Sequence, residues 1–201
     1  MKLFLIRHPK PEVTKGLCYG QLDVPLIADW QQSAEPLKQK LIQYISSSTK
    51  TSLARCAYYH SPLSRAALLA DYLSDGRSHS VSALKELDFG KWEGRCWEEI
   101  PKTEIDLWMQ DLVLTAPYEG ESLQDLAERL WQWWSQLAHD ELDACVLVVH
   151  AGVIKVLVSL LCQWPLAQCH RIDVGFCSVT ELQIIGDFIQ LKRLGAGDWV
   201  L

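Results

Sequence analysis

The 201-residue sequence lacks the cysteine pairs, the long apolar runs and the basic surplus that mark several classes of protein. Its seven cysteines form no Cys-x-x-Cys pair and are odd in number, which argues against a disulfide framework and against a zinc site. No apolar stretch approaches the roughly 18 residues of a transmembrane helix. The short apolar run after Lys2 is too brief for a signal-peptide core, so a reducing cytoplasm is the expected location.

The charge balance narrows the choice of partners. The formal net charge of −6 gives no general attraction to nucleic acid or to an anionic membrane surface, so neither is an expected partner. An anionic ligand would have to be held by a local cluster of basic groups. A hydrophobic content of 49%, without repeats or linkers, predicts a single domain over residues 1–201.

The pattern of apolar residues predicts strands that alternate with helices. Short apolar runs predict strands at 3–6, 54–59, 144–149, 177–185 and 188–194, the last two joined by a hairpin. Helical spacing predicts helices at 30–47, 64–74 (with Ser64 as the N-cap), 121–139 and 153–162. This order predicts an α/β fold, a three-layer α/β/α sandwich whose mostly parallel sheet is covered on both faces. Residues 91–120 fit the alternation least well and are interpreted as an insertion over one end of the sheet.

Three of the predicted strands end in similar polar groups. Arg7 and His8 follow the first strand, Arg65 comes shortly after the second, and His150 follows the strand at 144–149. Ligands of open α/β sheets bind beyond the carboxyl ends of the strands, so these side chains are expected to converge. Arginine forks suit phosphoryl oxygens, and the helix after His150 offers free backbone N–H groups at Ala151 and beyond. Each residue alone is more often an ordinary polar residue, but together they favour a phosphate site.

Several segments resemble the signatures of one protein family. Arg7-His8, residues 61–66 (Ser-Pro-Leu-Ser-Arg-Ala) and residues 150–154 (His-Ala-Gly-Val-Ile) resemble the three signatures of the histidine phosphatase superfamily, the phosphoglycerate mutase-like proteins. Residues 84–94 are similar to the family segment that carries the acid, and residues 120–122 (Gly-Glu-Ser) match a further landmark. The motifs also stand in the family's order. The resemblance implies the phosphoglycerate mutase-like fold and a phosphatase that needs neither a metal nor a cofactor.

The resemblance also implies a role for each matched residue. His8 would attack phosphorus and form a phosphohistidine, which splits one displacement into two easier ones. Glu86 would be the general acid and then the general base, whereas the neighbouring Asp88 and Glu93 are interpreted as exposed polar positions. Arg7, Arg65 and His150 would neutralise charge on the phosphoryl oxygens in the transition state, and Ala151 and Thr14 would help to bind phosphate.

The loop after His8 departs from the family's pattern. Most members have Gly and then an acidic residue where Pro9 and Lys10 stand here. Pro9 removes a backbone N–H beside the nucleophile, and Lys10 places a cation at the rim. Thr14 stands where relatives often have Asn, and its hydroxyl keeps a donor. These changes are expected to affect the substrate and its affinity more than the reaction.

Residues 16–26 look closest to the alpha-ribazole phosphatases, which remove the 5′-phosphate in the assembly of cobalamin's lower ligand. The resemblance therefore implies a small phosphorylated metabolite as the partner, with Cys18, Tyr19 and Gln21 in the substrate pocket. Cys18 is interpreted mainly as a small buried thiol. Tyr19, Trp92 and Trp97 are available to stack on a base-like ring, although each is as readily a core or rim aromatic.

Other functions remain as alternatives. A sugar-phosphate phosphatase or a phosphoglycerate-type mutase would use the same motifs. A mutase needs extra cations for a second phosphate, and the cations between Glu86 and His150 stand among many acids: Lys91, Arg95, Lys102 and Arg129. The non-enzyme alternative is a phosphate-ligand binding protein with little turnover. A cysteine-based phosphatase is excluded because no cysteine is followed six residues later by an arginine. Trp131, Trp133 and Trp134 cannot all face inward on one helix, which leaves open a buried contact with a second subunit, as in a homodimer, or with the stretch 91–120.

Overall fold

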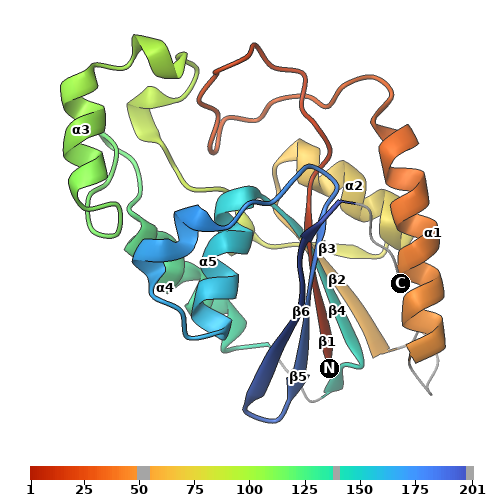
Figure 1. Cartoon of the computed structure of the whole chain (residues 1–201). Helices are drawn as coiled ribbons and strands as arrows, with labels where there is room; N and C mark the ends of the chain where they lie inside the picture. The colour runs from red at the N-terminus through yellow and green to blue at the C-terminus, as the bar shows by residue number, and fades with distance from the viewer. Residues whose placement is uncertain (49–54, 138–140, 198–201) are drawn as a thin grey trace.

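The computed structural model describes residues 1–48, 55–137 and 141–197 and contains a six-stranded sheet (Figure 1). The strands are β1 (Lys2–Arg7), β2 (Cys56–His60), β3 (Ser78–Ser80), β4 (Ala144–Val149), β5 (Val179–Ile185) and β6 (Phe188–Ala196). Their order across the sheet is β3-β2-β4-β1-β5-β6. The first four pair in parallel, and β5 and β6 are antiparallel, so the predicted mostly parallel sheet is confirmed.

Helices cover both faces of the sheet, which confirms the three-layer prediction. Figure 1 shows α1 (Trp30–Ser48) and α2 (Ser64–Ser74) on one side, and α4 (Leu123–Trp134) and α5 (Ala151–Leu161) on the other. Alternate residues of β1 belong to the two resulting cores: Phe4 and Ile6 pack towards α1 and α2, and Leu3 and Leu5 towards α4 and α5. A strand buried on both faces is apolar at every position.

The strands that lead to the site are deeply buried. All six residues of β4 are buried, as are Leu3 to Ile6 of β1. Each such side chain contributes roughly 1.5–3 kcal/mol to folding. The carboxyl ends of β1, β4 and β2, which are neighbours in the sheet, therefore project their next residues from a rigid support. Among the described residues, no helix is both long and apolar enough to cross a membrane.

Several predicted boundaries were wrong. The helix α4 ends at Trp134, where the sequence predicted residue 139, and residues 138 and 139 lie outside the described residues, as does Ala54 at the start of the second predicted strand. The hydroxyl of Ser135 donates to the carbonyl of Gln132 at 3.1 Å, and such local bonds compete with helix continuation. Ser64 is not an N-cap: Leu63 takes that position, and the N–H and hydroxyl of Ser64 both donate to Asp23.

The stretch 91–120 contains one short helix, α3 (Lys102–Gln110), preceded by single turns at Gly90–Trp92 and Trp97–Glu99. Figure 1 shows this stretch beside the long loop that follows β1, at the carboxyl end of that strand. Backbone bonds join the two segments, from the Cys18 N–H to the Arg95 carbonyl at 2.9 Å and from the Gly94 N–H to the Cys18 carbonyl at 2.8 Å. That the stretch is an insertion stays a prediction.

Candidate active site

The site residues predicted at the strand ends meet at the carboxyl ends of three adjacent strands. Arg7 ends β1 and His8 follows it, His150 stands between β4 and α5, and Arg65 lies in the first turn of α2, just after β2. The ring centroids of His8 and His150 are 5.1 Å apart. His8, Arg65 and His150 are 2%, 0% and 0% exposed. We call Arg7, His8, Arg65 and His150 the inner group.

His8 is held as a neutral ring with one free nitrogen. Its Nδ1 lies 2.6 Å from the carbonyl oxygen of Pro9, which can only accept, so Nδ1 carries the proton. Burial, together with the nearby Arg65 and Arg7 cations, lowers the pKa of His8 to about 3. The Nε2 lone pair is therefore unprotonated at neutral pH, as a nucleophile requires.

His150 is buried without a polar partner. Among the described residues, neither of its ring nitrogens has a hydrogen-bond partner. Burial first, then the competing protonation of His8 and the charges of Arg65, Arg7 and Arg129, hold the pKa of His150 well below its usual range. The ring thus offers an N–H donor to an anion, and in this state it does not supply the positive charge expected from the resemblance.

The two arginines are anchored through part of their guanidinium groups. Arg7 donates Nη1–H to the Val174 carbonyl at 2.6 Å, and its Cζ lies 3.9 Å from the ring centroid of Phe176. Arg65 donates to the carbonyls of Leu22 and Gly20 at 2.9 and 2.6 Å. The Nε atoms of both arginines are buried and have no partner within the described parts of the chain. Such unpaired donors are unusual and cost roughly 1–3 kcal/mol each, which indicates a site kept for an anion.

Glu86 faces this group from the other side. Its Oε2 accepts the Gly152 N–H of α5 at 3.0 Å, and its Oε1 accepts the Leu87 N–H at 2.9 Å. A Cβ at Gly152 would overlap Oε1 of Glu86. The absence of a side chain at Gly152 thus admits the carboxylate of Glu86.

Two further carboxylates beside Glu86 were interpreted from the sequence as exposed polar positions, and this was wrong, since both are half-buried. Asp88 accepts the Gly90 N–H at 2.7 Å. Glu93 accepts three backbone N–H groups, those of Gln21, Leu22 and Phe89. Glu93 therefore joins the loop that anchors Arg65 to the segment that carries Glu86.

A cavity of about 160 Å³ opens between these groups. It is lined by Arg7, His8, Leu17, Cys18, Tyr19, Gly20, Glu86, Phe89 and Trp97. Arg65 and His150 are buried behind it. We call Leu17, Tyr19, Glu86, Phe89 and Trp97 the outer wall. Leu17, Gly20 and Phe89 were missed by the sequence analysis, because nothing in the apolar pattern of an irregular loop shows which way a side chain points.

Some predicted site residues lie elsewhere. Thr14 is exposed, and Gln21 is half-buried with its N–H on Glu93, and neither lines the cavity. Trp92 does not line the cavity: it is buried in an aromatic cluster that also contains Phe89 and Trp97, and its indole N–H donates to Glu104 at 2.7 Å. Ala151 begins α5 beside His150. Burial and the Glu93 carboxylate raise the pKa of the Cys18 thiol to about 12, so it stays protonated, which agrees with a small buried thiol.

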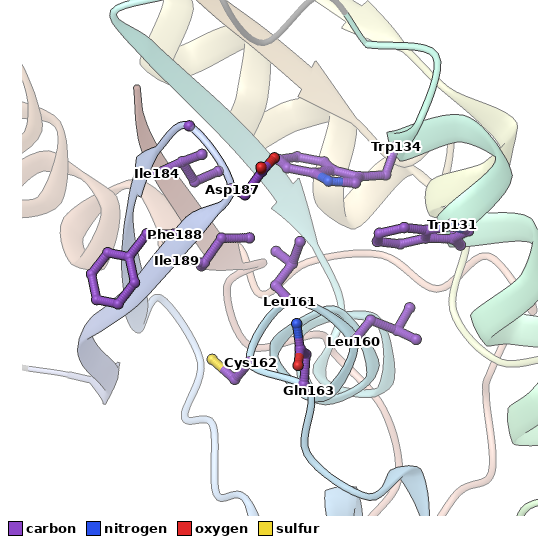
Figure 2. Close-up of a pocket in the computed structure, with 11 residues that line it drawn as sticks. Trp131, Trp134, Leu160, Leu161, Cys162, Gln163, Ile184, Asp187, Phe188 and Ile189 are labelled. Carbon is purple, nitrogen blue, oxygen red and sulfur yellow. The ribbon is translucent and has the colours of Figure 1, made fainter.

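A larger hollow of about 400 Å³ lies at the other end of the sheet (Figure 2). Figure 2 shows Trp131 and Trp134 of α4 across from the β5–β6 hairpin, with the end of α5 below them. The Ile184 N–H donates to the Met1 carbonyl at 2.9 Å, which places this hairpin at the amino end of β1, away from His8. No residue of the inner group or the outer wall lines this hollow.

Solved structures share this fold. The alpha-ribazole phosphatase from Shigella flexneri is similar, with a TM-score of 0.83 and 24% identity, over 98% of this chain and 97% of that chain. A phosphoserine phosphatase mutant from Entamoeba histolytica, in complex with phosphoserine, is similar with a TM-score of 0.82 and 23% identity, over 100% of this chain and 99% of that chain. At these identities the likeness concerns the fold.

Sequence comparison places the chain in a family. A bifunctional protein of Mycobacterium tuberculosis is 26% identical over 199 residues, which cover 96% of this chain and 53% of that protein. The chain thus spans about half the length of the curated relatives that it matches. The profile of the histidine phosphatase superfamily (branch 1) matches residues 3–197. The chain therefore belongs to the histidine phosphatase superfamily.

Proposed function

We propose that this chain is a metal-independent phosphomonoesterase that forms a phosphohistidine on His8. The observation that carries the proposal is the set of unpaired buried donors around His8: the Nε groups of Arg7 and Arg65 and the ring of His150. These donors surround a neutral histidine whose Nε2 lone pair is free. Buried N–H donors aimed at one place stabilise the charge that develops on transferring phosphoryl oxygens.

In the first step, Nε2 of His8 attacks phosphorus while the bond to the leaving oxygen breaks. The proton stays on Nδ1 and keeps its hydrogen bond to the Pro9 carbonyl, so the phosphorylated ring keeps a partner for its positive charge. Protonated Glu86 gives its proton to the leaving oxygen, which departs as an alcohol. Proton transfer of this kind is typically worth about 10²–10⁴-fold in rate.

In the second step, a water molecule attacks the phosphohistidine. Glu86, now a carboxylate, takes the proton from the water as the new P–O bond forms. The bond from phosphorus to Nε2 breaks, and the lone pair returns to His8. Inorganic phosphate leaves and Glu86 is protonated again, so the cycle closes without a redox partner.

The placement of cations supports a substrate with one phosphate group. Three of the four cations between Glu86 and His150 are engaged away from the cavity: Lys91 with Glu119, Arg95 with the Glu99 carbonyl, and Arg129 with Glu121. The fourth, Lys102, is exposed at the start of α3 and does not line the cavity. A second phosphate would have to be held by residues that this cavity does not offer.

The outer wall supports a leaving group with a ring. Tyr19, Phe89 and Trp97 contribute aromatic side chains to the cavity, and aromatic faces prefer planar partners. We therefore propose a small phosphorylated metabolite, and alpha-ribazole 5′-phosphate is the candidate suggested by residues 16–26 and by the name of the Shigella relative. Cobalamin assembly, in the cytoplasm, would then be the setting.

The enzyme proposal is tested by release of 4-nitrophenol from p-nitrophenyl phosphate in the presence of EDTA. We expect turnover by the wild-type protein and a loss of about 10⁴-fold or more in His8→Ala. His170→Ala is the matched control, because His170 is exposed and does not line the cavity. No release by the wild type, or equal release by His8→Ala, would contradict the proposal and favour a phosphate-binding protein.

A screen over a panel of phosphorylated metabolites tests the substrate. Alpha-ribazole 5′-phosphate should rank among the best substrates, as measured by kcat/KM. A preference of several orders of magnitude for a sugar bisphosphate would overturn the single-phosphate argument while leaving the reaction on His8 intact.

A further inference from the structure

The half-buried side chain of Arg129, on α4, carries a dense set of hydrogen bonds away from the cavity. Nε and Nη2 form a two-point ion pair with Glu121, at 2.6 and 2.9 Å. Nη1 donates to the carbonyl of Ala83 at 2.5 Å, and Nη2 also donates to the carbonyls of Lys85 and Glu86 at 2.9 and 3.0 Å. The guanidinium therefore contacts the backbone of the acid-bearing segment at three carbonyls.

Glu121 holds the same segment beyond Glu86. Its Oε2 accepts the Asp88 N–H at 3.3 Å, and its own N–H donates to the Asp88 carbonyl at 2.8 Å. The Arg129–Glu121 pair thus contacts the chain on both sides of Glu86. The side chains of this pair are 22% and 14% exposed, so water screens the bonds only in part.

The segment itself has little regular structure. After the single turn at Ser82–Leu84, no strand or α-helix forms until α3, so no regular ladder fixes the backbone at Glu86. The carboxylate must nevertheless lie within reach of the leaving oxygen, and a misplacement of about 1 Å can cost about 10²-fold in rate. The Gly152 N–H of α5 holds the carboxylate itself, and the backbone that carries Glu86 is held by a side chain of α4.

We infer that Arg129, paired with Glu121, is a positioning residue that holds Glu86 at the distance from His8 at which it transfers the proton. The inference rests on the role proposed above for Glu86. Arginine suits the task because its planar fork presents five donors in one fixed geometry. A lysine would keep the charge but could not donate hydrogen bonds to Glu121 and to three carbonyls at the same time.

Two substrates of similar size separate positioning from mere structural support. The phenolate of p-nitrophenyl phosphate leaves without a proton, whereas the alkoxide of benzyl phosphate needs one. The ratio of the two kcat/KM values does not depend on how much of the protein is folded, since both are measured on one sample. It reports only the steps up to phosphohistidine formation.

Four variants are compared with the wild type: Arg129→Met, Arg129→Lys, Glu86→Gln and Glu128→Gln. Glu86→Gln should lower kcat/KM for benzyl phosphate by about 10²–10⁴-fold and that for p-nitrophenyl phosphate far less. Arg129→Met should lower kcat/KM for benzyl phosphate by about 10–100-fold and change that for p-nitrophenyl phosphate by less than about threefold. Arg129→Lys should give values between those of Arg129→Met and the wild type. Glu128, exposed on the same helix and bonded to Gln124, is the matched control and should leave both values unchanged.

The outcomes distinguish the two proposals. Suppose that Glu86→Gln lowers kcat/KM for benzyl phosphate more than for p-nitrophenyl phosphate, while both Arg129 variants lower the two kcat/KM values alike or not at all. The positioning role is then wrong and the acid assignment stands. If Glu86→Gln lowers kcat/KM for both substrates alike, the acid assignment fails and the positioning role fails with it. Should Arg129→Met not fold, the substrate ratio of Arg129→Lys decides in the same way.

Discussion

The inner group and the outer wall meet at one cavity, which Arg7 and His8 line with Arg65 and His150 buried behind them, but the two parts are built differently. Arg7, His8 and His150 directly continue or end buried parallel strands, and Arg65 lies in a helix that starts just after one. Glu86, Phe89 and Trp97 come instead from turns and irregular chain, and they are half-buried. The inner group is thus fixed by the sheet, whereas the outer wall depends on individual side-chain bonds such as those of Glu93 and Arg129.

This difference separates the reaction from the choice of substrate. A rigid, dehydrated group of donors suits the transfer of a phosphoryl group whatever is attached to it. A wall made of turns can change without disturbing the sheet, because loops tolerate substitution better than the elements they connect. Changes to the inner group should therefore affect every substrate alike, and changes to the outer wall should affect some substrates more than others.

Among the substitutions that compare the two parts of the site, the largest effect is expected from Arg65→Lys in the inner group. Lysine keeps the charge but loses the fork that reaches the Gly20 and Leu22 carbonyls while leaving Nε for phosphate. We expect kcat/KM to fall by about 10²–10³-fold, to the same extent for benzyl phosphate and p-nitrophenyl phosphate. A loss that differed strongly between the two substrates would break the distinction between the inner group and the outer wall.

The next effect concerns stability in acid. The pKa of folded His8 is about 3 and the usual value is 6.5, so between these pH values the unfolded chain binds a proton that the folded chain does not. The free energy of unfolding should therefore fall as the pH is lowered through this window, by about 2 kcal/mol between pH 7 and pH 5 for His8 alone. Urea titrations of the wild type and of His8→Gln at the two pH values measure this. An equal loss in both proteins would show that His8 is not the dehydrated neutral ring described here.

A smaller and selective effect is expected from Trp97→Leu in the outer wall. Loss of an aromatic contact should lower kcat/KM for p-nitrophenyl phosphate by about 3–10-fold. The inhibition constant for inorganic phosphate, which has no leaving group, should stay within about twofold. Equal weakening of both would mean that Trp97 supports the phosphate site as well, and the two parts of the cavity would not be separable.

The smallest effect is expected at the hollow in Figure 2. Trp131 is 49% exposed there, and it lies on the same helix as Arg129. Trp131→Gln should change kcat/KM for either substrate by less than about twofold, since surface substitutions away from a site are usually within ±0.5 kcal/mol. A tenfold loss would show that this end of the molecule is coupled to the cavity.

That the residues of the inner group lie together could be predicted from the sequence because two signals agreed there. An apolar run that stops at Arg7-His8, and another that stops at His150, mark strand ends from burial alone, and parallel strands bring their ends to one edge. The fold class and the main strands followed from the same pattern. The position of α3 did not, because residues 91–120 show no clear period.

The outer wall could be predicted only in part. Glu86 was identified by resemblance, but Glu93 was interpreted as exposed, and Arg129 was counted only as a cation near the site. The bonds of both are to backbone groups far away in the sequence, which no local pattern encodes. Trp92 and Trp97 illustrate the same limit, since one lies in the core and the other lines the cavity.

The most direct test of the account is the identity of the phosphorylated residue. The protein is mixed with p-nitrophenyl phosphate, quenched within milliseconds in alkali, which preserves phosphohistidine, and digested for mass spectrometry. We expect a phosphoryl group on the peptide that contains His8, lost on treatment with acid and absent from His8→Ala. Phosphate on another residue, or steady hydrolysis in His8→Ala, would contradict the central claim that His8 is the nucleophile.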